Sequence, residues 1–480
     1  MKKVYAFNEG GKDLINILGG KGGNLSEMKK IGLPIPEGII VSTTACKEFF
    51  KDGKKITKEL ENEILEKLEY LQEVTGKKFE GENPLLVSVR SGAPVSMPGM
   101  MDTILNLGMN DNTAEKMITI FKDKVFVHEL YCRFIQMFSE IVMGIEKEHF
   151  FKLKEQLFAE RKDEDKIETY KMVIKASKEL YKKETGKDFP ESPKEQLFMA
   201  VNAIFNSWEN DRAILYRKIN GIDDSMGTAV VIQEMVFGNL NEISGTGVAF
   251  SRNPSNGEKE VFGEYLLKAQ GEDIVAGIRT PEPISKLKEQ LPEIYDQFIK
   301  LAKVLEDHNK DMQDIEFTIE NGKLYLLQTR NGKRSPYAAV KIAVDMVKEG
   351  ILTKEEAIMK VDPNVLPQLL HGDFDPEATK TAVLLGKGLP GSAGVAIGRV
   401  MFASERVETR ALSILVREET SPEDIKGISL AQGIVTVKGG ATSHGAVVAR
   451  GMGKCCVTGC GDIQINDIKR EMYIGGHTVK

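Results

Sequence analysis

The order of strand-like and helical patterns along the 480 residues constrains the fold more than any other feature of this chain. Short apolar runs separated by glycine-rich turns occupy residues 1–110, and similar runs return between about 228 and 330. Between these regions, from about 112 to 220, the sequence is highly charged and its apolar residues have helical spacing. This order predicts a mixed α/β (α+β) domain over residues 1–335 with a helical insertion at 112–220.

The last third of the chain has a different organisation. Residues 336–391 form a predicted helical linker that ends in a glycine-rich stretch, and we expect a hinge at 386–394. From 392 to 480, short strand-like runs predict a separate, compact α/β module. Because domains usually hold about 100–200 residues, two or three domains are expected in total.

Composition argues against several classes of function. No uninterrupted apolar run approaches the roughly 18 residues of a membrane-spanning helix, and the start of the chain lacks the apolar region of a signal peptide. The net charge of −6 gives no reason to expect nucleic acid or a membrane as a partner. The five cysteines have neither zinc-site spacing nor that of a disulfide framework, so we expect free thiols and a cytoplasmic location.

The segment 439–451 contains the most informative single residue, His444. Two glycines and two hydroxyl residues, Thr442 and Ser443, precede the histidine, and a helix-compatible run follows it. This order predicts a helix N-terminus at His444, where free N–H groups and the helix dipole favour a phosphate and disfavour a charged imidazole. A neutral ring can attack phosphorus. We therefore predict that His444 carries a phosphoryl group; a surface or core histidine is the alternative.

Two cationic residues are candidates for phosphate binding. Lys21 lies within Gly19–Gly23, whose glycines permit close approach of the backbone to a phosphate, although Gly22 after the lysine excludes a P-loop. Arg90 ends an apolar strand-like run, and its guanidinium can bind phosphate through two hydrogen bonds. A plain turn and a surface arginine at a strand end are the respective alternatives.

Asn321-Gly322 between two alternating runs predicts a β-hairpin. We expect a three-residue loop, Glu320–Gly322, because a two-residue loop would mix polar and apolar residues on each face. The predicted cross-strand pairs are Asp314 with Gln328, Ile315 with Leu327, and Phe317 with Tyr325. One face of the hairpin would then be apolar, and the other would carry Asp314, Glu316, Gln328 and Arg330.

The polar face of this hairpin is a candidate metal site. Its oxygen ligands suit a magnesium ion that bridges nucleotide phosphates, while Arg330 and Lys21 offset the negative charge. A solvated strand face with weak ion pairs is the alternative.

Five segments together resemble the dikinase family that includes pyruvate phosphate dikinase and phosphoenolpyruvate synthase. They occur in the order of that family and span nearly the whole chain: 17–25, 87–93, 96–105, 244–250 and 439–451. The sequence around Thr442, Ser443 and Cys455-Cys456 is closer to the pyruvate, phosphate enzymes than to the synthases.

The resemblance implies a fold for each part of the chain. Residues 1–335 would form an ATP-grasp nucleotide-binding domain, 336–391 a helical linker, and 392–480 a swivelling phosphohistidine domain. The family also has a large C-terminal barrel that binds pyruvate. No such barrel is present here, and we expect the phosphohistidine domain to be incomplete at residue 480.

The resemblance also implies roles for individual residues. Loops 96–101 and 244–247 would close over the phosphates of ATP, and Gln233 with Met235 would line the adenine pocket. The implied nucleotide-binding residues are Lys21, Arg90, Gln233, Met235, Thr246, Asp314, Glu316, Gln328 and Arg330. The implied Mg²⁺ ligands are Glu316 and Gln328. The implied catalytic residues are His444, Arg90 and Glu272; for Glu272, a loop carboxylate without a special role is the alternative.

The activity implied by the resemblance is a phosphotransfer through His444. The imidazole would attack the β-phosphoryl group of ATP and release AMP, and inorganic phosphate would take the terminal phosphoryl group to give pyrophosphate. The phosphohistidine would then phosphorylate pyruvate, for which the absent C-terminal domain is needed. ATP, phosphate and pyrophosphate are the expected ligands, and a homodimer is compatible with the resemblance.

Three alternatives stay open from sequence. The same histidine chemistry could serve a phosphoenolpyruvate synthase-like enzyme or an antibiotic phosphotransferase, or the chain could be a non-catalytic nucleotide-binding fragment. Thr442 resembles the threonine that is phosphorylated in regulated members of the family, and a role as N-cap of the histidine helix is the alternative.

Overall fold

The computed structural model describes residues 2–97, 99–161, 166–271, 273, 280–370, 381–407 and 412–480. The chain divides into two compact units, Met1–Val236 and Phe237–Lys480, and each unit combines β-sheet with α-helices. The predicted mixed α/β class is therefore confirmed. Among the helices that the structure describes, none has the length and apolar character needed to cross a membrane.

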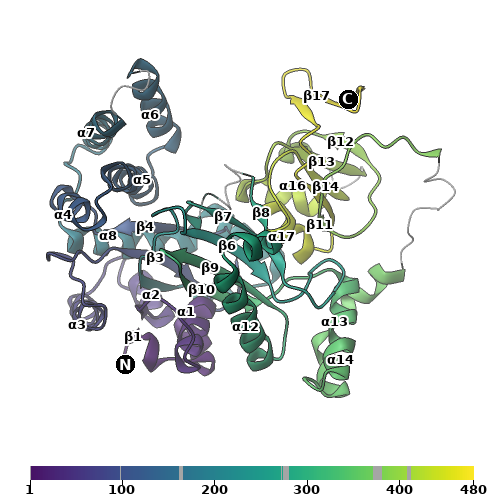
Figure 1. Cartoon of the computed structure of the whole chain (residues 1–480), viewed down its shortest axis with the longest axis horizontal. Helices are drawn as coiled ribbons and strands as arrows, with labels where there is room; N and C mark the ends of the chain where they lie inside the picture. The colour runs from purple at the N-terminus through teal and green to yellow at the C-terminus, as the bar shows by residue number, and fades with distance from the viewer. Residues whose placement is uncertain are drawn as a thin grey trace. The chain divides into compact units, whose positions relative to one another are not determined.

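The first unit is built on a five-stranded antiparallel sheet in the order β1-β2-β5-β3-β4. Its strands are Val4–Ala6 (β1), Gly38–Val41 (β2), Val87–Gly92 (β3), Thr103–Leu107 (β4) and Ala229–Glu234 (β5). The apolar run of β5 is buried on both faces, which fits its central position. Helices α1 (Ile15–Lys30) and α2 (Thr43–Lys51) pack against this sheet, while α3 (Lys58–Thr75) packs against β1 and β2 (Figure 1).

Helices fill the segment for which the sequence predicts an insertion. Their bounds are Asp111–Phe121 (α4), Lys124–Met143 (α5), Lys147–Arg161 (α6), Lys166–Thr185 (α7), Pro193–Asn206 (α8) and Asp211–Asn220 (α9). α5 packs against α7 and α8 and places Phe134 and Phe138 around Phe189. α4, α5, α6 and α7 form one group of helices in Figure 1.

The second unit contains a sheet of five strands in the order β10-β9-β6-β7-β8, all antiparallel. Its strands are Gly245–Phe250 (β6), Phe262–Leu267 (β7), Glu282–Pro283 (β8), Gln313–Glu320 (β9) and Lys323–Asn331 (β10). The helices around it are Leu287–Gln290 (α11), Pro292–Asn309 (α12), Pro336–Lys348 (α13) and Lys354–Lys360 (α14). α12 covers one face of β9 and β10, where the rings of Phe298 and Phe317 lie 4.7 Å apart (Figure 1).

The hairpin of β9 and β10 departs from the predicted register. Lys323 pairs with Glu320, so the loop has two residues, Asn321 and Gly322, both with left-handed φ values of 48° and 75°. The predicted three-residue loop and its pairs are therefore wrong. The register shifts beyond the loop instead, because Leu327 is an extra residue between the pairs of Leu326 and Gln328.

The bulge at Leu327 keeps polar and apolar residues of the hairpin on separate faces, which is the arrangement that the three-residue loop was predicted to give. Beyond it, Gln328 lies opposite Glu316 and Arg330 opposite Asp314. Directly opposed residues of an antiparallel pair point to the same face. The predicted polar face with these four residues is therefore confirmed, although a different irregularity produces it.

The strands between residues 389 and 458 form a second sheet of the same unit, in the order β11-β15-β14-β13-β12. β12 to β15 are parallel, and β11 is antiparallel to β15. The strands are Leu389–Ser392 (β11), Arg399–Met401 (β12), Ser413–Arg417 (β13), Gly433–Thr436 (β14) and Cys455–Thr458 (β15). The helices between them are Ile425–Leu430 (α16) and His444–Gly451 (α17), and a small antiparallel sheet follows with Gln464–Asn466 (β16), Glu471–Ile474 (β17) and His477–Val479 (β18).

Candidate functional site

The histidine loop, residues 439–443, connects the carboxyl end of β14 to α17. α17 begins at His444, so the predicted helix N-terminus is confirmed. Gly439 has a left-handed φ of +92°, a conformation that few other residues adopt. Ser443 is the N-cap residue but makes no side-chain cap hydrogen bond. The cap role considered for Thr442 is therefore wrong, and the Thr442 hydroxyl contacts another strand instead.

The surroundings of His444 favour the neutral form of its ring. Both ring nitrogens are buried, and neither has a hydrogen-bond partner among the described residues. Burial lowers the pKa of His444 below 6.5, and the charges of Asp424 and Glu423 oppose this shift only in part. The predicted direction is confirmed, but its main cause is burial. A neutral imidazole with a free lone pair is the nucleophilic form.

The sheet of β6 to β10 has a polar face on the side opposite α12. Glu264 of β7 pairs with Val248 of β6, Val248 with Glu316 of β9, and Glu316 with Gln328 of β10. Two residues along, a second row contains Phe250, Asp314 and Arg330. Paired residues and residues two apart share a face. The three carboxylates, the amide and the guanidinium, which come from β7, β9 and β10, therefore lie together on one face.

The polar groups of this face already interact. The Gln328 Nε2 amide donates to Glu316 Oε1 over 3.0 Å, and Arg330 Nε donates to Asp314 Oδ2 over 2.7 Å. Asp314 is nearly fully buried, and its second oxygen, Oδ1, has no hydrogen-bond partner among the described residues. A buried carboxylate oxygen without a partner is costly and fits a ligand that supplies a positive charge or a proton.

The donor set of the polar face suits Mg²⁺ in part. Glu316 and Gln328 supply oxygens of the kind that Mg²⁺ prefers, and Asp314 adds a free carboxylate oxygen nearby. No group of three or more His, Cys, Asp or Glu side chains arranged to hold a metal occurs in the described part of the chain. A magnesium ion here would therefore need oxygens from nucleotide phosphates to complete its coordination, as Mg²⁺ sites in nucleotide enzymes commonly do.

The histidine loop contacts the polar face through Glu264. The Glu264 carboxylate accepts hydrogen bonds from the Ala441 N–H over 3.2 Å and from the Thr442 hydroxyl over 3.0 Å. A Cβ at Gly440 would lie 2.1 Å from Glu264 Oε1, so glycine is needed for this contact. Burial raises the pKa of Glu264, although the bonds from Thr442 and Ala441 act in the opposite direction.

Glu264 was missed by sequence reasoning. The only feature that marks it is a single carboxylate in the otherwise uncharged strand Phe262–Leu267, a pattern that also fits an exposed strand position. Its importance becomes visible only when residue 264 and residues 440–442 are brought together.

In the first unit, the structure places Lys21 close to the strand that carries Arg90. Gly19–Gly23 lies within α1 rather than in a free loop, and α1 is kinked at Gly19, which has a φ of +71°. The Gly20 N–H donates to the Ala93 carbonyl over 2.9 Å, and a Cβ at Gly19 would come within 1.7 Å of the Gly92 carbonyl oxygen. The glycines therefore serve the close packing of α1 on the end of β3.

The other predicted nucleotide-binding residues are buried in their sheets. Gln233 donates through Nε2 to the Pro36 carbonyl over 3.1 Å, and Met235 follows β5 with little exposure. Thr246 lies on the same face as Val248, but its hydroxyl donates to the Phe317 carbonyl over 3.1 Å. Glu272 lies outside the described residues.

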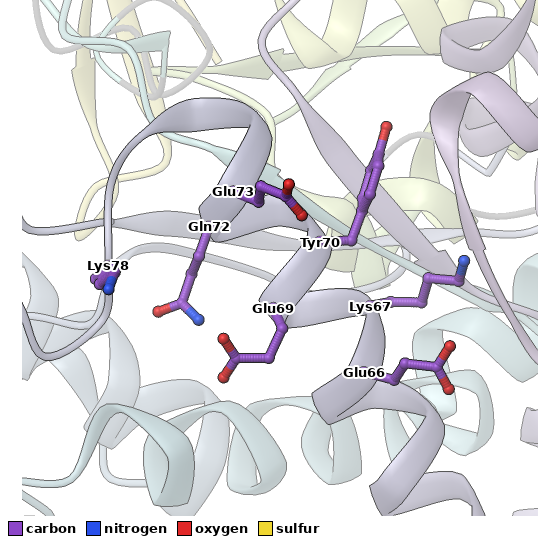
Figure 2. A pocket seen from close by; sticks show the side chains of 7 residues that line it. All are labelled: Glu66, Lys67, Glu69, Tyr70, Gln72, Glu73 and Lys78. Carbon is purple, nitrogen blue, oxygen red and sulfur yellow. The ribbon is translucent and has the colours of Figure 1, made fainter.

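The hollow drawn in Figure 2 is a separate surface of the first unit. Its lining comes from α3 and the segment that follows it: Glu66, Lys67, Glu69, Tyr70, Gln72, Glu73 and Lys78. It contains none of the predicted site residues. Three glutamates against two lysines give it a net negative lining, which does not suit nucleotide phosphates.

Two models of known protein families match parts of this chain. Residues 15–73, 52–300 and 289–350 match the family model described as pyruvate phosphate dikinase, AMP/ATP-binding domain. Residues 410–477 match the model described as PEP-utilising enzyme, mobile domain. Both matches cover segments that carry the predicted site residues.

Individual relatives match along nearly the whole chain. A pyruvate, phosphate dikinase of Clostridium symbiosum is 52% identical over 487 residues, covering 99% of this chain and 56% of that protein. A chloroplastic pyruvate, phosphate dikinase of Flaveria pringlei is 48% identical, covering 100% of this chain and 51% of that protein. One from Rhizobium meliloti is 47% identical, covering 98% and 55%.

The chain thus spans about half the length of the curated relatives that it matches. The nucleotide-binding model alone covers well over half of the chain, in the segments that contain Lys21, Arg90, Glu316 and Gln328. From the matched models and the identity to these relatives, the chain belongs to the pyruvate phosphate dikinase family.

Proposed function

We propose that this chain transfers a pyrophosphoryl group from ATP to its own His444 and then passes the terminal phosphoryl group to inorganic phosphate. The proposal is based on the hydrogen bonds between the histidine loop and Glu264 on the polar face of the β6–β10 sheet. The loop that leads directly into His444 is thereby brought to the surface that carries the carboxylate, amide and guanidinium groups. This is the combination that phosphoryl transfer requires.

The first step uses the lone pair of His444. A ring nitrogen attacks the β-phosphorus of ATP, the bond from that phosphorus to the oxygen shared with the α-phosphorus breaks, and AMP leaves with that oxygen. Arg330 can then offset charge on the transferring group, and the low pKa of His444 keeps the ring unprotonated at neutral pH. In the second step phosphate accepts the terminal phosphoryl group, pyrophosphate leaves and phosphohistidine remains.

Mg²⁺ is the proposed cofactor, with Glu316 and Gln328 as its protein ligands and Asp314 as a supporting carboxylate. When bound together with ATP, it would neutralise negative charge on the phosphates that react. Lys21 and Arg90 are proposed to bind phosphates of the same nucleotide, and Gln233 with Met235 to line its adenine site. Thr246 and Glu272 are proposed to complete the nucleotide site.

The proposed domain organisation follows from the sequence pattern. Residues 1–335 would bind the nucleotide, residues 336–391 would act as linker, and residues 392–480 would carry His444 between sites. Because one imidazole cannot contact two distant sites at once, a hinge such as 386–394 is needed for a second transfer. The relatives are pyruvate, phosphate dikinases, so transfer from phosphohistidine to pyruvate is proposed for a protein that also contains the part of those relatives beyond the matched half.

The test uses ATP labelled at the β-phosphate, Mg²⁺ and phosphate. We expect acid-labile label on the parent chain and none on His444→Ala, because only the imidazole can hold the group. With phosphate omitted, label from the γ-position should also stay on the protein, and adding phosphate should release it as pyrophosphate. ATP binding must be equal in both chains. Equal labelling of parent and variant, or ATP binding without any label, would contradict the proposal.

A further inference from the structure

Lys333 is a half-buried cation that contacts no counter-charge among the described residues. It lies just after β10, and a Cβ at Gly451 would come within 2.7 Å of its Nζ, so the ammonium lies against the last residue of α17. Its ammonium makes no ion pair or hydrogen bond with the described residues. Burial, Arg330 and Arg450 lower the pKa of Lys333 to about 8, and only Asp314 acts to raise it.

Arg450, near Lys333, is a second cation whose charge is not neutralised by a contacting carboxylate. It is 3% exposed, and its two terminal nitrogens donate to the main-chain carbonyls of Gly391 and Ala441. The remaining nitrogen, Nε, is buried without a partner among the described residues. Burial lowers the pKa of Arg450 to about 10. Carbonyl oxygens satisfy hydrogen bonds but do not neutralise the charge.

These two cations meet the second row of the polar face. The Arg450 guanidinium lies over the Phe250 ring at 5.3 Å, and Phe250 is opposite Asp314, which is opposite Arg330. The Lys333 cluster, as we call Asp314, Arg330, Lys333 and Arg450, therefore contains three cations and one carboxylate. Asp314 is already paired with Arg330. Glu264 also faces Arg450, but its oxygens accept from the histidine loop.

We propose that Lys333 and Arg450, with Arg330, bind a phosphate oxyanion, and that the ligand is the inorganic phosphate that accepts the terminal phosphoryl group. This inference rests on the proposed function. An oxyanion would supply the missing negative charge and accept from the free ammonium and from Arg450 Nε. Phosphate is the chemical class that fits, because it carries two charges and several acceptor oxygens.

The rise along α17 sets the separation between the two positions. Arg450 follows His444 by six residues, which corresponds to about 9 Å of helix rise. A pyrophosphorylated histidine extends its terminal phosphorus away from the ring, and the acceptor must lie farther out again. An oxygen of phosphate then attacks the terminal phosphorus, and the bond from that phosphorus to the bridging oxygen breaks. The bridging oxygen keeps the electron pair and stays on the phosphohistidine, and pyrophosphate forms.

A structural role for Lys333 predicts different results. Its ammonium lies at the C-terminal end of α17, where a positive charge interacts favourably with the helix dipole. In that case the removal of the charge would lower stability and leave phosphate binding unchanged.

The experiment compares the full chain with Lys333→Met and Lys333→Arg, and uses Lys341→Met on α13 as a matched lysine control. Calorimetry with inorganic phosphate alone measures binding without any histidine chemistry. We expect Lys333→Met to bind phosphate at least tenfold more weakly, Lys333→Arg to retain most of the affinity and Lys341→Met to match the parent. Release of pyrophosphate from labelled protein should fall in Lys333→Met at least tenfold more than the phosphate-independent labelling step.

The possible outcomes distinguish free inorganic phosphate from a phosphate group of the nucleotide as the bound oxyanion. Weaker ATP binding in Lys333→Met with unchanged phosphate binding would assign the cluster to a phosphate of the nucleotide and overturn the acceptor role. Unchanged binding of both ligands, or a parent chain that binds no phosphate, would overturn the inference. If phosphate binding depends on Lys333 while His444 is never labelled, the proposed function fails and the anion site stands.

Discussion

Two charged clusters lie near the same end of β6, and they are built in opposite ways. The Arg252 network consists of Arg252, Glu306 and Glu349. The Arg252 guanidinium is fully buried and donates to both carboxylates, with distances from 2.7 to 3.1 Å. In the Lys333 cluster, the cations outnumber the carboxylates, and Asp314 Oδ1 and Arg450 Nε have no partner among the described residues.

The two clusters differ in how far their charges are paired within the protein. In the Arg252 network, hydrogen bonds from Arg252 and Lys259 overcome burial and lower the pKa of Glu349 to about 2, so this carboxylate stays ionised and bound. Such a network links β6, α12 and α13 and has no capacity left for a ligand. The Lys333 cluster keeps unsatisfied buried groups, which cost stability until a ligand pairs with them.

The largest expected effect comes from Arg252→Met. This change leaves the buried Glu306 without its cation and should lower the free energy of unfolding by about 3–5 kcal/mol. Urea unfolding measures it, with Lys259→Met as the control, because that exposed lysine should contribute no more than about 1 kcal/mol. A loss below about 1 kcal/mol in Arg252→Met would show that the network is not a structural element and would remove the basis of the comparison.

Gly440→Ala tests whether the histidine loop must rest on Glu264 for the chemistry. The new Cβ would overlap the Glu264 carboxyl, and relief of that overlap costs about 1–3 kcal/mol. We expect labelling of His444 to slow by about tenfold or more with unchanged ATP binding. Gly461→Ala is the matched control, since nothing lies within 4 Å of a Cβ at that position. Equal rates in both variants would contradict the importance of the contact.

Lys333→Met tests the second cluster, because here the loss of a half-buried charge without a partner should stabilise the chain. Without phosphate we expect a gain of about 1–3 kcal/mol at pH 7. The pKa of Lys333, which faces Arg330, Arg450 and Asp314, is about 8 instead of the usual 10.5, so between these values the unfolded chain binds more protons. The stability of the parent should therefore rise with pH in this window, and the variant should lack that slope.

Saturating phosphate supplies the control for this prediction. A bound anion raises the pKa of Lys333 and should reduce the pH slope of the parent, while the variant should not respond. A variant that is less stable than the parent at pH 7 would indicate that Lys333 stabilises α17 and belongs with the structural charges.

The smallest expected effect concerns the protonation of His444. Its pKa lies below 6.5, so lowering the pH from 7.5 to 6.5 should change the fraction of neutral ring by less than about twofold. NMR titration of histidine-labelled protein measures this directly, and the spectrum of His444→Gln identifies the resonance. A pKa above 6.5 would mean that Asp424 and Glu423 outweigh burial.

Much of the fold could be predicted because local patterns act over short distances. The apolar spacing in residues 112–220 gave helices, and the glycine and hydroxyl residues before His444 gave a helix that begins at that residue. The polar face of the β9–β10 hairpin was also predictable, since alternation fixes which residues share a face. Its register was not, because a bulge at Leu327 and a loop of three residues satisfy the same alternation.

The sequence by itself determined the family, the histidine at the start of a helix and the four polar residues of one hairpin face. Each of these depends on residues that are close along the chain or on motifs in a fixed order. Only the tertiary structure decided that Glu264 supports residues 441 and 442, and that Lys333 lies against Gly451. These contacts join segments more than 100 residues apart, and their energies depend on burial and on the number of neighbouring charges, which no local pattern contains.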